Sequence, residues 1–452
     1  MNRYDTKDCI FALATAWGKG AIAVVRVSGD GCIGILDGAV LKRRSFKGLS
    51  DVETNKAVYC TLVDPSDSKP VDDVVVTLFR DGHGYTGEEA LEISCHGGVQ
   101  VVSSVLSLMA SLGFRQALPG EFTLRAFLHG KMDLTRAEAV NEMINAQGSV
   151  GRSMALRRLN GALFRRIEEI KATVARMMSI VEVQLDYSED EVGEDLTFPM
   201  GELDSAIEAL GTIRDSYSTG RLYSQGARIV LAGPSNAGKS SLFNYFLKED
   251  RSIVSPVKGT TRDFIEAMCT IGGIPVRLFD TAGFRDFSSG EIEDEGMRRS
   301  RNLVDSADLI IYLVDSSELI EIDESVTSDP RCIPVLNKTD IKNVDMDGFL
   351  KLSVATGYGF DSLCKAIEAK LREGLVLADD SALVIESERQ KELLGRAASS
   401  LSAVRTAVSE DLPLDIVSMD IQEALEALGE LTGEVTTDDI LDRIFGSFCV
   451  GK

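Results

Sequence analysis

The stretch 227–240, ARIVLAGPSNAGKS, constrains the fold more than any other part of this 452-residue chain. An apolar run typical of a buried strand leads into a glycine-rich loop, which ends on Lys239 and Ser240 at the expected start of a helix. Backbone N–H groups of such a loop can surround phosphates, the lysine can bind the β- and γ-phosphate oxygens, and the serine hydroxyl can bind Mg²⁺. The pattern therefore predicts a strand–loop–helix unit that binds a nucleoside triphosphate.

Three further motifs narrow this prediction to a guanine nucleotide. In DTAG at 280–283, Asp280 can hold Mg²⁺ through water and the Gly283 N–H can reach the γ-phosphate. In NKTD at 337–340, Asp340 can accept two N–H groups of guanine, a pattern that adenine does not offer. Thr261, in GTTRD at 259–263, can bind Mg²⁺ and the γ-phosphate in the GTP state. In this order, the motifs predict a GTP-hydrolysing domain.

Two positions depart from the usual pattern of such domains. In SVATG at 353–357, Val354 and Ala355 stand where an alanine and a lysine or arginine usually pack on the base, so we expect looser base packing. Phe284 stands where Ras-like switches place the glutamine that orients the attacking water. Hydrolysis must therefore use a residue from elsewhere, and the sequence leaves four candidates open: Glu291, Glu293, Arg262 and Arg285.

The distribution of apolar runs, glycine turns and helical periodicity along the chain predicts a multidomain α/β protein with four segments. Residues 1–130 mix short apolar runs with glycine turns, typical of a mixed α/β domain, and residues 223–376 alternate strands and helices, typical of a Ras-like doubly wound domain. Residues 131–222 and 377–452 show helical periodicity, including an apolar stripe from Leu163 to Val181. Because a lone stripe must be buried, we expect one discontinuous helical domain into which the GTPase domain is inserted.

Composition limits the partners and the compartment. The chain has 48 basic and 71 acidic residues, a net charge of −23, so any contact with RNA must be local or shared with a more basic partner. Its eight cysteines form no CxxC pair, which favours free thiols over a zinc site or disulfides. No apolar run is long enough to span a bilayer and the N-terminus lacks a secretory pattern, so we expect a cytoplasmic protein without a membrane partner.

Motifs outside the GTPase segment carry a resemblance to a known family. They are YTGE at 85–88, CHGG at 95–98, PGEFTLRAF at 119–127 and the ending FCVGK at 448–452. With these motifs, essentially the whole chain resembles the tRNA-modification GTPase MnmE (TrmE) family. The resemblance implies an N-terminal α/β domain that binds a 5-formyltetrahydrofolate-type folate and dimerises, a discontinuous helical domain and an inserted GTPase domain.

The resemblance also implies an activity and partners. Members of the family form homodimers and work with an FAD-dependent protein, MnmG (GidA), in a heterotetramer or larger complex, with FAD bound only by that partner. Together they install an aminomethyl-type group, such as carboxymethylaminomethyl, on carbon 5 of the wobble uridine of certain tRNAs. GTP hydrolysis in the family depends on K⁺ as well as Mg²⁺ and is activated when two GTPase domains dimerise.

Carried over motif by motif, the resemblance assigns roles to individual residues. Glu293 would orient water, with Lys239 on the phosphates and Phe284 as the hydrophobic replacement of glutamine; a covalent and a structural role both stay open for Cys449. The ligands implied are Ser240 and Thr261 for Mg²⁺, Asn236, Ser255, Val257 and Thr260 for K⁺, and Arg26, Glu92, Lys131 and Lys452 for folate. The GTP contacts are Asn236, Ala237, Gly238, Lys239, Ser240, Ser241, Ser255, Thr260, Thr261, Asp280, Thr281, Ala282, Gly283, Asn337, Lys338, Asp340, Ser353, Val354 and Ala355.

Two other functions share part of this pattern. A ribosome-assembly GTPase of the Era or Der kind has the same phosphate loop, but it carries a second GTPase domain or a basic RNA-binding domain, whereas this chain has one set of motifs and an acidic balance. A non-enzymatic GTP switch would turn over slowly, would be insensitive to potassium and would retain nucleotide tightly.

Overall fold

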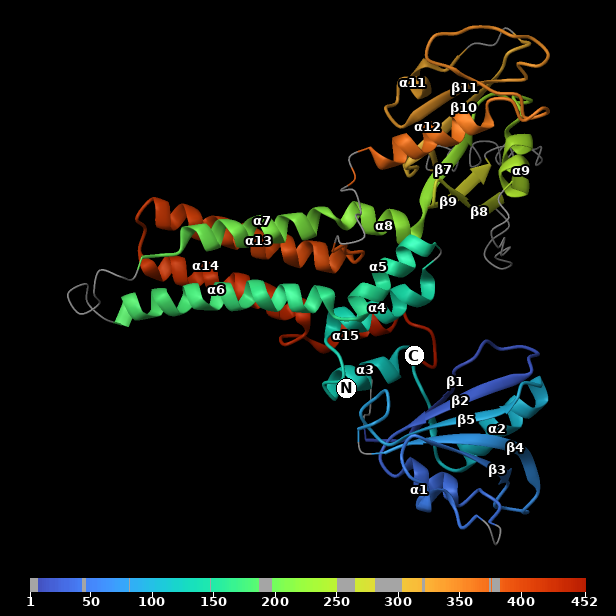
Figure 1. The fold of residues 1–452 in the computed structure, drawn as a ribbon, viewed down its shortest axis with the longest axis vertical. Coiled ribbons are helices and arrows are strands. Elements are labelled where there is room, and N and C mark those ends of the chain that lie inside the picture. The colour runs from blue at the N-terminus through green and yellow to red at the C-terminus, as the bar shows by residue number, and fades with distance from the viewer. Residues whose placement is uncertain are drawn as a thin grey trace, which may run out of the picture. The chain divides into compact units, whose positions relative to one another are not determined.

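The computed structural model describes residues 7–42, 46–80, 82–146, 148–186, 197–249, 265–280, 303–318, 322–373, 375 and 383–452 (Figure 1). It contains two compact units, which are described separately. The first comprises Met1–Asn141, Arg158–Ala172 and Leu425–Lys452, and the second comprises Glu142–Arg157 and Thr173–Ala424. Four helices continue from one unit into the other: α4 (Leu134–Asn145), α5 (Ser149–Leu159), α6 (Ala162–Asp186) and α14 (Leu414–Thr432).

A six-stranded sheet organises the first unit. Its strand order is β3-β4-β5-β2-β1-β6, and its pairs are antiparallel except β1 with β6. The strands are β1 (Ile10–Leu13), β2 (Ile22–Ser28), β3 (Lys56–Val63), β4 (Pro70–Phe79), β5 (Ala90–His96) and β6 (Arg115–Gln116). The helices of this unit outside the four shared ones are α1 (Cys32–Asp37), α2 (Val99–Ser111), α3 (Glu121–Leu128) and α15 (Asp438–Phe445), with a 3-10 turn at Leu49–Asp51.

The two faces of this sheet differ because side chains alternate along each strand. Val25 and Val27 of β2 point into a core that α1 and α2 complete with Ile33, Leu36 and Val105. Arg26 lies between these two valines in the sequence and therefore faces the other side of the sheet, where it pairs in register with Glu92 of β5. This second face carries the candidate folate residues.

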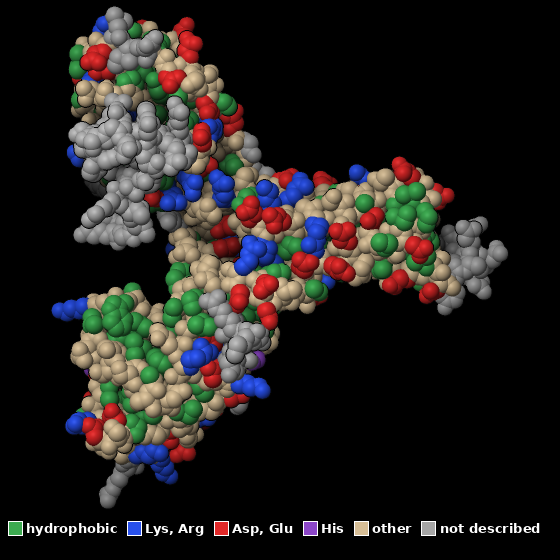
Figure 2. Space-filling model, turned by 180° about the vertical axis from the view of Figure 1, so that it is seen from behind, with side chains coloured by type: hydrophobic (Ala, Val, Ile, Leu, Met, Phe, Trp, Pro, Cys, Tyr) green, Lys and Arg blue, Asp and Glu red, His purple; other side chains and the backbone are tan. Residues whose placement is uncertain are grey.

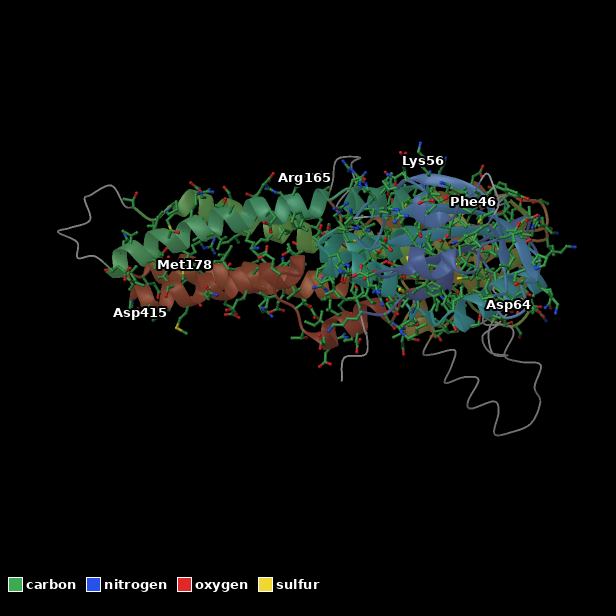
Figure 3. All side chains as sticks on the ribbon, turned by 90° about the horizontal axis from the view of Figure 1, so that it is seen from below. Phe46, Lys56, Asp64, Arg165, Met178 and Asp415 are labelled. Carbon is green, nitrogen blue, oxygen red and sulfur yellow. The ribbon has the colours of Figure 1, made fainter. Side chains whose placement is uncertain are left out.

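The expected amphipathic helix is present as α6. The stripe predicted from its spacing is buried along the whole helix: Leu163, Ile167, Ile170, Val174, Met177 and Val181. Figure 3 shows the side chains along α6, with Arg165 near its beginning and Met178 farther along. In the second unit α7 (Met200–Asp215) packs against α13 (Glu388–Ser409), so helical segments from both sides of the GTPase motifs meet, as the discontinuous arrangement requires.

A second six-stranded sheet forms the core of the second unit. Its order is β12-β11-β10-β7-β9-β8, parallel throughout except for the antiparallel pair β8–β9. The strands are β7 (Ala227–Ala232), β8 (Ile265–Ile271), β9 (Ile274–Asp280), β10 (Leu309–Asp315), β11 (Cys332–Asn337) and β12 (Leu350–Lys351). The other helices whose bounds the structure describes in full are α8 (Tyr217–Gln225), α9 (Lys239–Glu249), α11 (Glu324–Thr327) and α12 (Phe360–Arg372). The multidomain α/β class and the doubly wound GTPase domain are thereby confirmed.

All eight cysteines are free, as expected, and five of them are buried. Among the described residues, no helix combines the length and the apolar character needed to cross a bilayer.

Candidate GTP and folate sites

The phosphate loop lies where the sequence predicts, between β7 and α9. β7 is a central strand whose side chains are mostly buried, so its carboxyl end is held firmly by both neighbouring strands, β9 and β10. Lys239, the first residue of α9, is buried, and its ammonium donates to the carbonyl oxygens of Gly233 at 2.9 Å and Pro234 at 2.7 Å. Asn236 has a left-handed φ of 64°. The loop therefore gathers a fixed cation and the N-terminal N–H groups of an 11-residue helix, which suits phosphate binding.

Two oxygen-bearing side chains predicted to hold Mg²⁺, one directly and one through water, meet beside this loop. The Ser240 hydroxyl donates to Oδ2 of Asp280 at 2.7 Å, and Asp280 is buried at the end of β9. A hydroxyl and a carboxylate side by side, next to a phosphate loop, are the ligand types that Mg²⁺ prefers, so these residues fit the predicted metal. The ion would neutralise charge on the β- and γ-phosphates during hydrolysis.

A cavity of about 480 Å³ lies next to the loop and contains the predicted base-binding residues. Asp340 accepts a hydrogen bond from the Ser353 hydroxyl at 2.6 Å, which orients its carboxylate. The residues lining the cavity come from the phosphate loop, from α9, from the NKTD motif and the residue after it, and from the 353–357 loop: Gly238, Ser241, Asn244, Tyr245, Lys248, Asn337, Lys338, Asp340, Ile341, Val354 and Ala355.

The Asn337 side chain joins the base cavity to the phosphate loop. Its Nδ2 donates to the Ala237 carbonyl at 2.8 Å, and its Oδ1 accepts from the Val354 N–H at 3.2 Å. Gly238 makes this approach possible, because a Cβ there would lie 2.3 Å from Asn337 Nδ2 and the backbone φ is 95°. The buried Asn337 therefore fixes three motifs relative to one another.

Lys338 has a partner that the sequence did not reveal. Its ammonium donates to Oδ2 of Asp315 at 2.6 Å, and Asp315 is buried at the end of β10. Burial raises the pKa of Asp315, but hydrogen bonds from Lys338 and Ser317 outweigh burial and hold the pKa below its usual value. The carboxylate therefore stays ionised and fixes the lysine beside the cavity.

Part of the predicted GTP site lies outside the described residues. These positions are Ser255, Val257, Thr260, Thr261, Thr281, Ala282, Gly283, Phe284 and Glu293, together with the alternatives Arg262, Arg285 and Glu291. Their assigned roles in binding K⁺, Mg²⁺ and water stay predictions.

Two of the predicted folate residues, Arg26 and Glu92, pair on the face of the first sheet opposite α1 and α2. The Arg26 guanidinium donates to Oε1 of Glu92 at 2.9 and 3.2 Å and to the Gly451 carbonyl at 3.3 Å. The rings of Tyr85 and Phe122 lie against it, with centroids 5.5 and 5.8 Å from its central carbon. The C-terminal motif thus reaches Arg26, as a shared site requires.

Lys131 and Lys452 contact the two motifs that carry Tyr85 and Phe122. Lys131 donates to the Gly82 carbonyl at 2.8 Å, and its stem lies against Gly87 of the YTGE motif. The Lys452 carbonyl accepts from the Phe122 N–H at 3.2 Å. Partly exposed Glu92 can accept N–H groups of a pterin and lysine ammonium groups can bind carboxylates, so these residue types suit a folate. Cys449 is exposed, and its carbonyl accepts from the Gly120 N–H at 3.5 Å.

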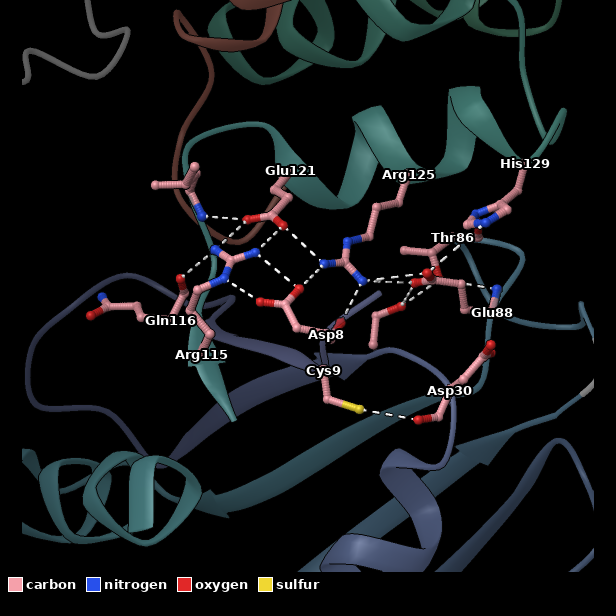
Figure 4. A network of polar contacts seen from close by, with 12 residues as sticks. Asp8, Cys9, Asp30, Thr86, Glu88, Arg115, Gln116, Glu121, Arg125 and His129 are labelled. Carbon is pink, nitrogen blue, oxygen red and sulfur yellow. Dashed lines mark hydrogen bonds and ion pairs between the residues drawn. The ribbon is translucent and has the colours of Figure 1, made fainter. Parts of the chain in front are cut away.

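A buried ion cluster lies next to these residues and was missed by the sequence analysis (Figure 4). Arg125 of α3 is completely buried and donates to Asp8 at 2.7 Å, to Glu121 at 3.0 Å and to Glu88 at 3.3 Å. Arg115 contacts the same Asp8 and donates to Glu121 at 2.6 Å. Partial burial raises the pKa of Asp8, but its hydrogen bonds to both arginines outweigh burial and lower the pKa.

The cluster joins the two segments that carry the rings beside Arg26. Glu88 follows Tyr85 in the 85–88 motif and accepts from the Ser28 hydroxyl at 2.7 Å, whereas Glu121 precedes Phe122 in α3. Its only signal in the sequence is the spacing of Glu121 and Arg125, one helical turn apart. We infer that the cluster positions both rings.

Family models and curated relatives match this chain over nearly its whole length. A family model described as the MnmE helical domain matches residues 134–449, and one described as the GTP-binding protein TrmE N-terminus matches residues 9–131. Curated relatives named tRNA modification GTPase MnmE include those of Treponema denticola, 38% identical over 100% of both chains, and Alkaliphilus oremlandii, 37% identical over 98% of this chain and 99% of the relative.

A solved structure with a similar part is the G domain of the FeoB iron transporter from T. maritima. It is 25% identical, covers 32% of this chain and 98% of its own, and has a TM-score of 0.25.

Proposed function

Because the chain belongs to the MnmE family of tRNA modification GTPases, we propose that its GTP hydrolysis is potassium-dependent and serves the modification of carbon 5 of the wobble uridine, adding a carboxymethylaminomethyl-type group. The chain is a GTPase, and full-length similarity separates it from ribosome-assembly GTPases and from non-enzymatic switches. The observation that supports the proposal is that one chain combines the nucleotide-site contacts of Ser240, Asp280 and Asp340 with the Arg26–Glu92 pair, each set positioned by its own sheet.

In the GTP site, the described residues bind and orient the nucleotide and its Mg²⁺. Lys239 would bind the phosphates, Ser240 would bind Mg²⁺ directly and Asp280 through water, and Asp340 would select guanine. Asn236 lies in the phosphate loop with its backbone in the left-handed region, at the position proposed to bind K⁺. K⁺ would supply the positive charge that an arginine finger supplies in other GTPases.

Turnover in potassium chloride and in sodium chloride, at equal ionic strength and with Mg²⁺ present, tests this proposal. We expect much faster hydrolysis in potassium, and faster still at concentrations that favour dimers of the GTPase domain. Asn236→Ala should lose the potassium response while sodium-supported turnover stays unchanged. Equal rates in the two salts would disprove the potassium dependence.

Glu293 is proposed to orient the attacking water, since Phe284 cannot. A residue that acts only in the transition state lowers the rate constant and leaves ground-state affinity intact. Glu293→Ala should therefore slow single-turnover hydrolysis by about 10²–10⁴-fold, with unchanged affinity for GTP. Glu291→Ala is the matched control, and the assignment is wrong if Glu291→Ala alone is slow.

We further propose that the chain forms a homodimer through the open sheet face of its N-terminal domain. Ile22, Tyr59 and Val75 lie on this face, opposite α1 and α2, and are 66%, 63% and 40% exposed. Large apolar side chains gathered on a domain surface are typical of an interface. The proposed occupant is a second copy of the chain.

Sedimentation of Ile22→Asp and Tyr59→Asp tests the dimer. Both variants should be monomeric at concentrations where the parental chain is dimeric. Ile35→Asp, an exposed position of α1 on the opposite side of the sheet, should remain dimeric. Dimers of unchanged stability in the two sheet-face variants would contradict the proposal.

The substrate and the second partner follow from the family. The proposed substrate is tRNA and the proposed partner is the FAD-dependent MnmG, in a cytoplasmic complex of both proteins. Basic and acidic side chains are mixed along the helical region in Figure 2, and the net charge of the chain is −23, so we propose that MnmG shares the tRNA contact. Mass spectrometry of wobble uridines from a strain that lacks this protein tests the modification, which should be absent.

A further inference from the structure

One wall of the base cavity is built by α9. Tyr245 lines this cavity together with Val354 and Ala355 of the 353–357 loop. Its side chain is half-buried, whereas Ala355 is exposed. A tyrosine therefore stands next to the loop that lacks a long cationic side chain.

Because position 355 is not a lysine or arginine, the base lacks the side chain that usually packs over it. A lysine or arginine at position 355 would pack its stem over the guanine ring, but Ala355 has only a methyl group and Val354 a short branched chain. Asp340 can still read the edge of the base, since its carboxylate is oriented by Ser353. Edge contacts and Lys338, which also lines the cavity, would leave part of the apolar surface of the base in contact with water, which costs affinity.

The Tyr245 ring is held in place by two neighbours. Its centroid lies 4.7 Å from that of Phe360, the first residue of α12, with the planes at 62°, an edge-to-face arrangement. Phe360 in turn lies 4.9 Å from buried Phe246 of the core. Because Phe360 is anchored in this way, it fixes the orientation of the tyrosine.

The second neighbour is the base loop itself. Gly357 has a φ of 78°, and a Cβ at this position would lie only 2.6 Å from the Tyr245 hydroxyl oxygen. The loop backbone therefore passes directly beside the ring, and glycine provides the space for it. Tyr245 is thus packed between the start of α12 and the loop that carries Val354 and Ala355, on the wall of the cavity.

From this arrangement we propose that Tyr245 packs against the guanine base and replaces the cationic side chain absent at position 355. Stacking of a base on an aromatic ring stabilises the complex whichever phosphates follow, so GDP and GTP gain equally. Tyr245 is then a determinant of affinity and not of the hydrolysis rate. The inference rests on the proposed position of guanine at Asp340.

Competition titrations of GDP and a non-hydrolysable GTP analogue against a fluorescent nucleotide test the proposal on the full-length chain. Tyr245→Ala should weaken both ligands by roughly tenfold, and Tyr245→Phe should bind within about twofold of the parental chain because the ring is kept. Tyr245→Leu preserves apolar packing on Phe360 but lacks the flat face, so it should also bind several-fold more weakly.

Two controls separate the possible outcomes. Tyr358→Ala removes an exposed tyrosine of the same loop that does not line the cavity, and it should bind nucleotide normally. Asp340→Ala should lose guanine affinity; if it does not, the position of the base is wrong. If Asp340→Ala loses affinity while Tyr245→Ala and Tyr245→Leu bind like the parental chain, or if Tyr358→Ala is equally weak, the role of Tyr245 is disproved.

Discussion

Arg125 illustrates how much a single residue can matter for the first compact unit. It is fully buried among the carboxylates of Asp8, Glu88 and Glu121. Arg125→Met would leave these carboxylates without their shared cation, and breaking a buried pair by removing one partner costs about 3–5 kcal/mol. We therefore expect a large loss of stability in this unit. Urea denaturation followed by the fluorescence of Trp17, the sole tryptophan of the chain, together with circular dichroism, measures it.

An exposed ion pair of the same unit is the matched control. Lys69 pairs with Asp67, and both side chains are largely exposed, so Lys69→Met should change stability by less than about 1 kcal/mol. A similarly small effect of Arg125→Met would show that the carboxylates around it find other partners.

At the scale of single residues, sequence motifs predicted the residues whose spacing is fixed by the ligand. They missed the residues whose partners are distant in the chain. Lys239, Ser240 and Asp340 are recognisable because a phosphate loop and a guanine edge demand them in short motifs. Asp8 and Arg125 are separated by 117 positions, and only the folded sheet brings them together. No periodicity or motif in a single sequence records such a pair.

At the scale of elements, the ends of neighbouring strands cooperate at the base cavity. Asp315 ends β10, Asn337 ends β11, and the two residues are paired in register. Lys338 follows directly, with a left-handed φ of 62°, and donates to Asp315. The parallel alignment of the two strands thus places a buried carboxylate under the lysine beside the base.

Asp315→Asn should therefore weaken guanine nucleotide binding. The amide retains an acceptor for Ser317 but cannot hold the Lys338 ammonium by charge, and a hydrogen bond to a charged group contributes about 1.5–3 kcal/mol, so roughly a tenfold loss of GDP affinity is expected. Calorimetric titration measures it. Asp323→Asn, which alters the N-cap of α11, should leave affinity unchanged. Parental affinity in Asp315→Asn would mean that the strand backbone alone positions the lysine.

The strands around the motifs were predictable, but their order was not. Apolar runs at 227–232, 276–279 and 309–314 appear as β7, β9 and β10, because a strand buried on both faces needs continuous apolar residues. The order β12-β11-β10-β7-β9-β8 depends on long-range pairing, including the antiparallel β8. The wall that α9 contributes through Tyr245 likewise depends on where α12 begins.

At the scale of the whole molecule, the two candidate sites belong to different compact units. Arg26, Glu92, Lys131 and Lys452 lie in the first unit, and the phosphate loop with the NKTD motif lies in the second. Each set is held by contacts within its own sheet and adjoining loops. The two ligands should therefore be separable by mutation.

We expect Arg26→Ala and Lys131→Ala to abolish folate binding and to leave GTP affinity intact. Arg26 holds Glu92 and the Gly451 carbonyl, so its loss removes a cation and also releases the C-terminal motif from the sheet. Lys131→Ala removes the ammonium and the stem that lies against Gly87, and leaves the backbone of the turn after α3 in place. Asp340→Ala provides the reciprocal control, since it should lose GTP and retain folate. Calorimetric titration of each variant with 5-formyltetrahydrofolate and with a GTP analogue measures both affinities, and parental folate affinity in the Arg26 and Lys131 variants would place the folate site elsewhere.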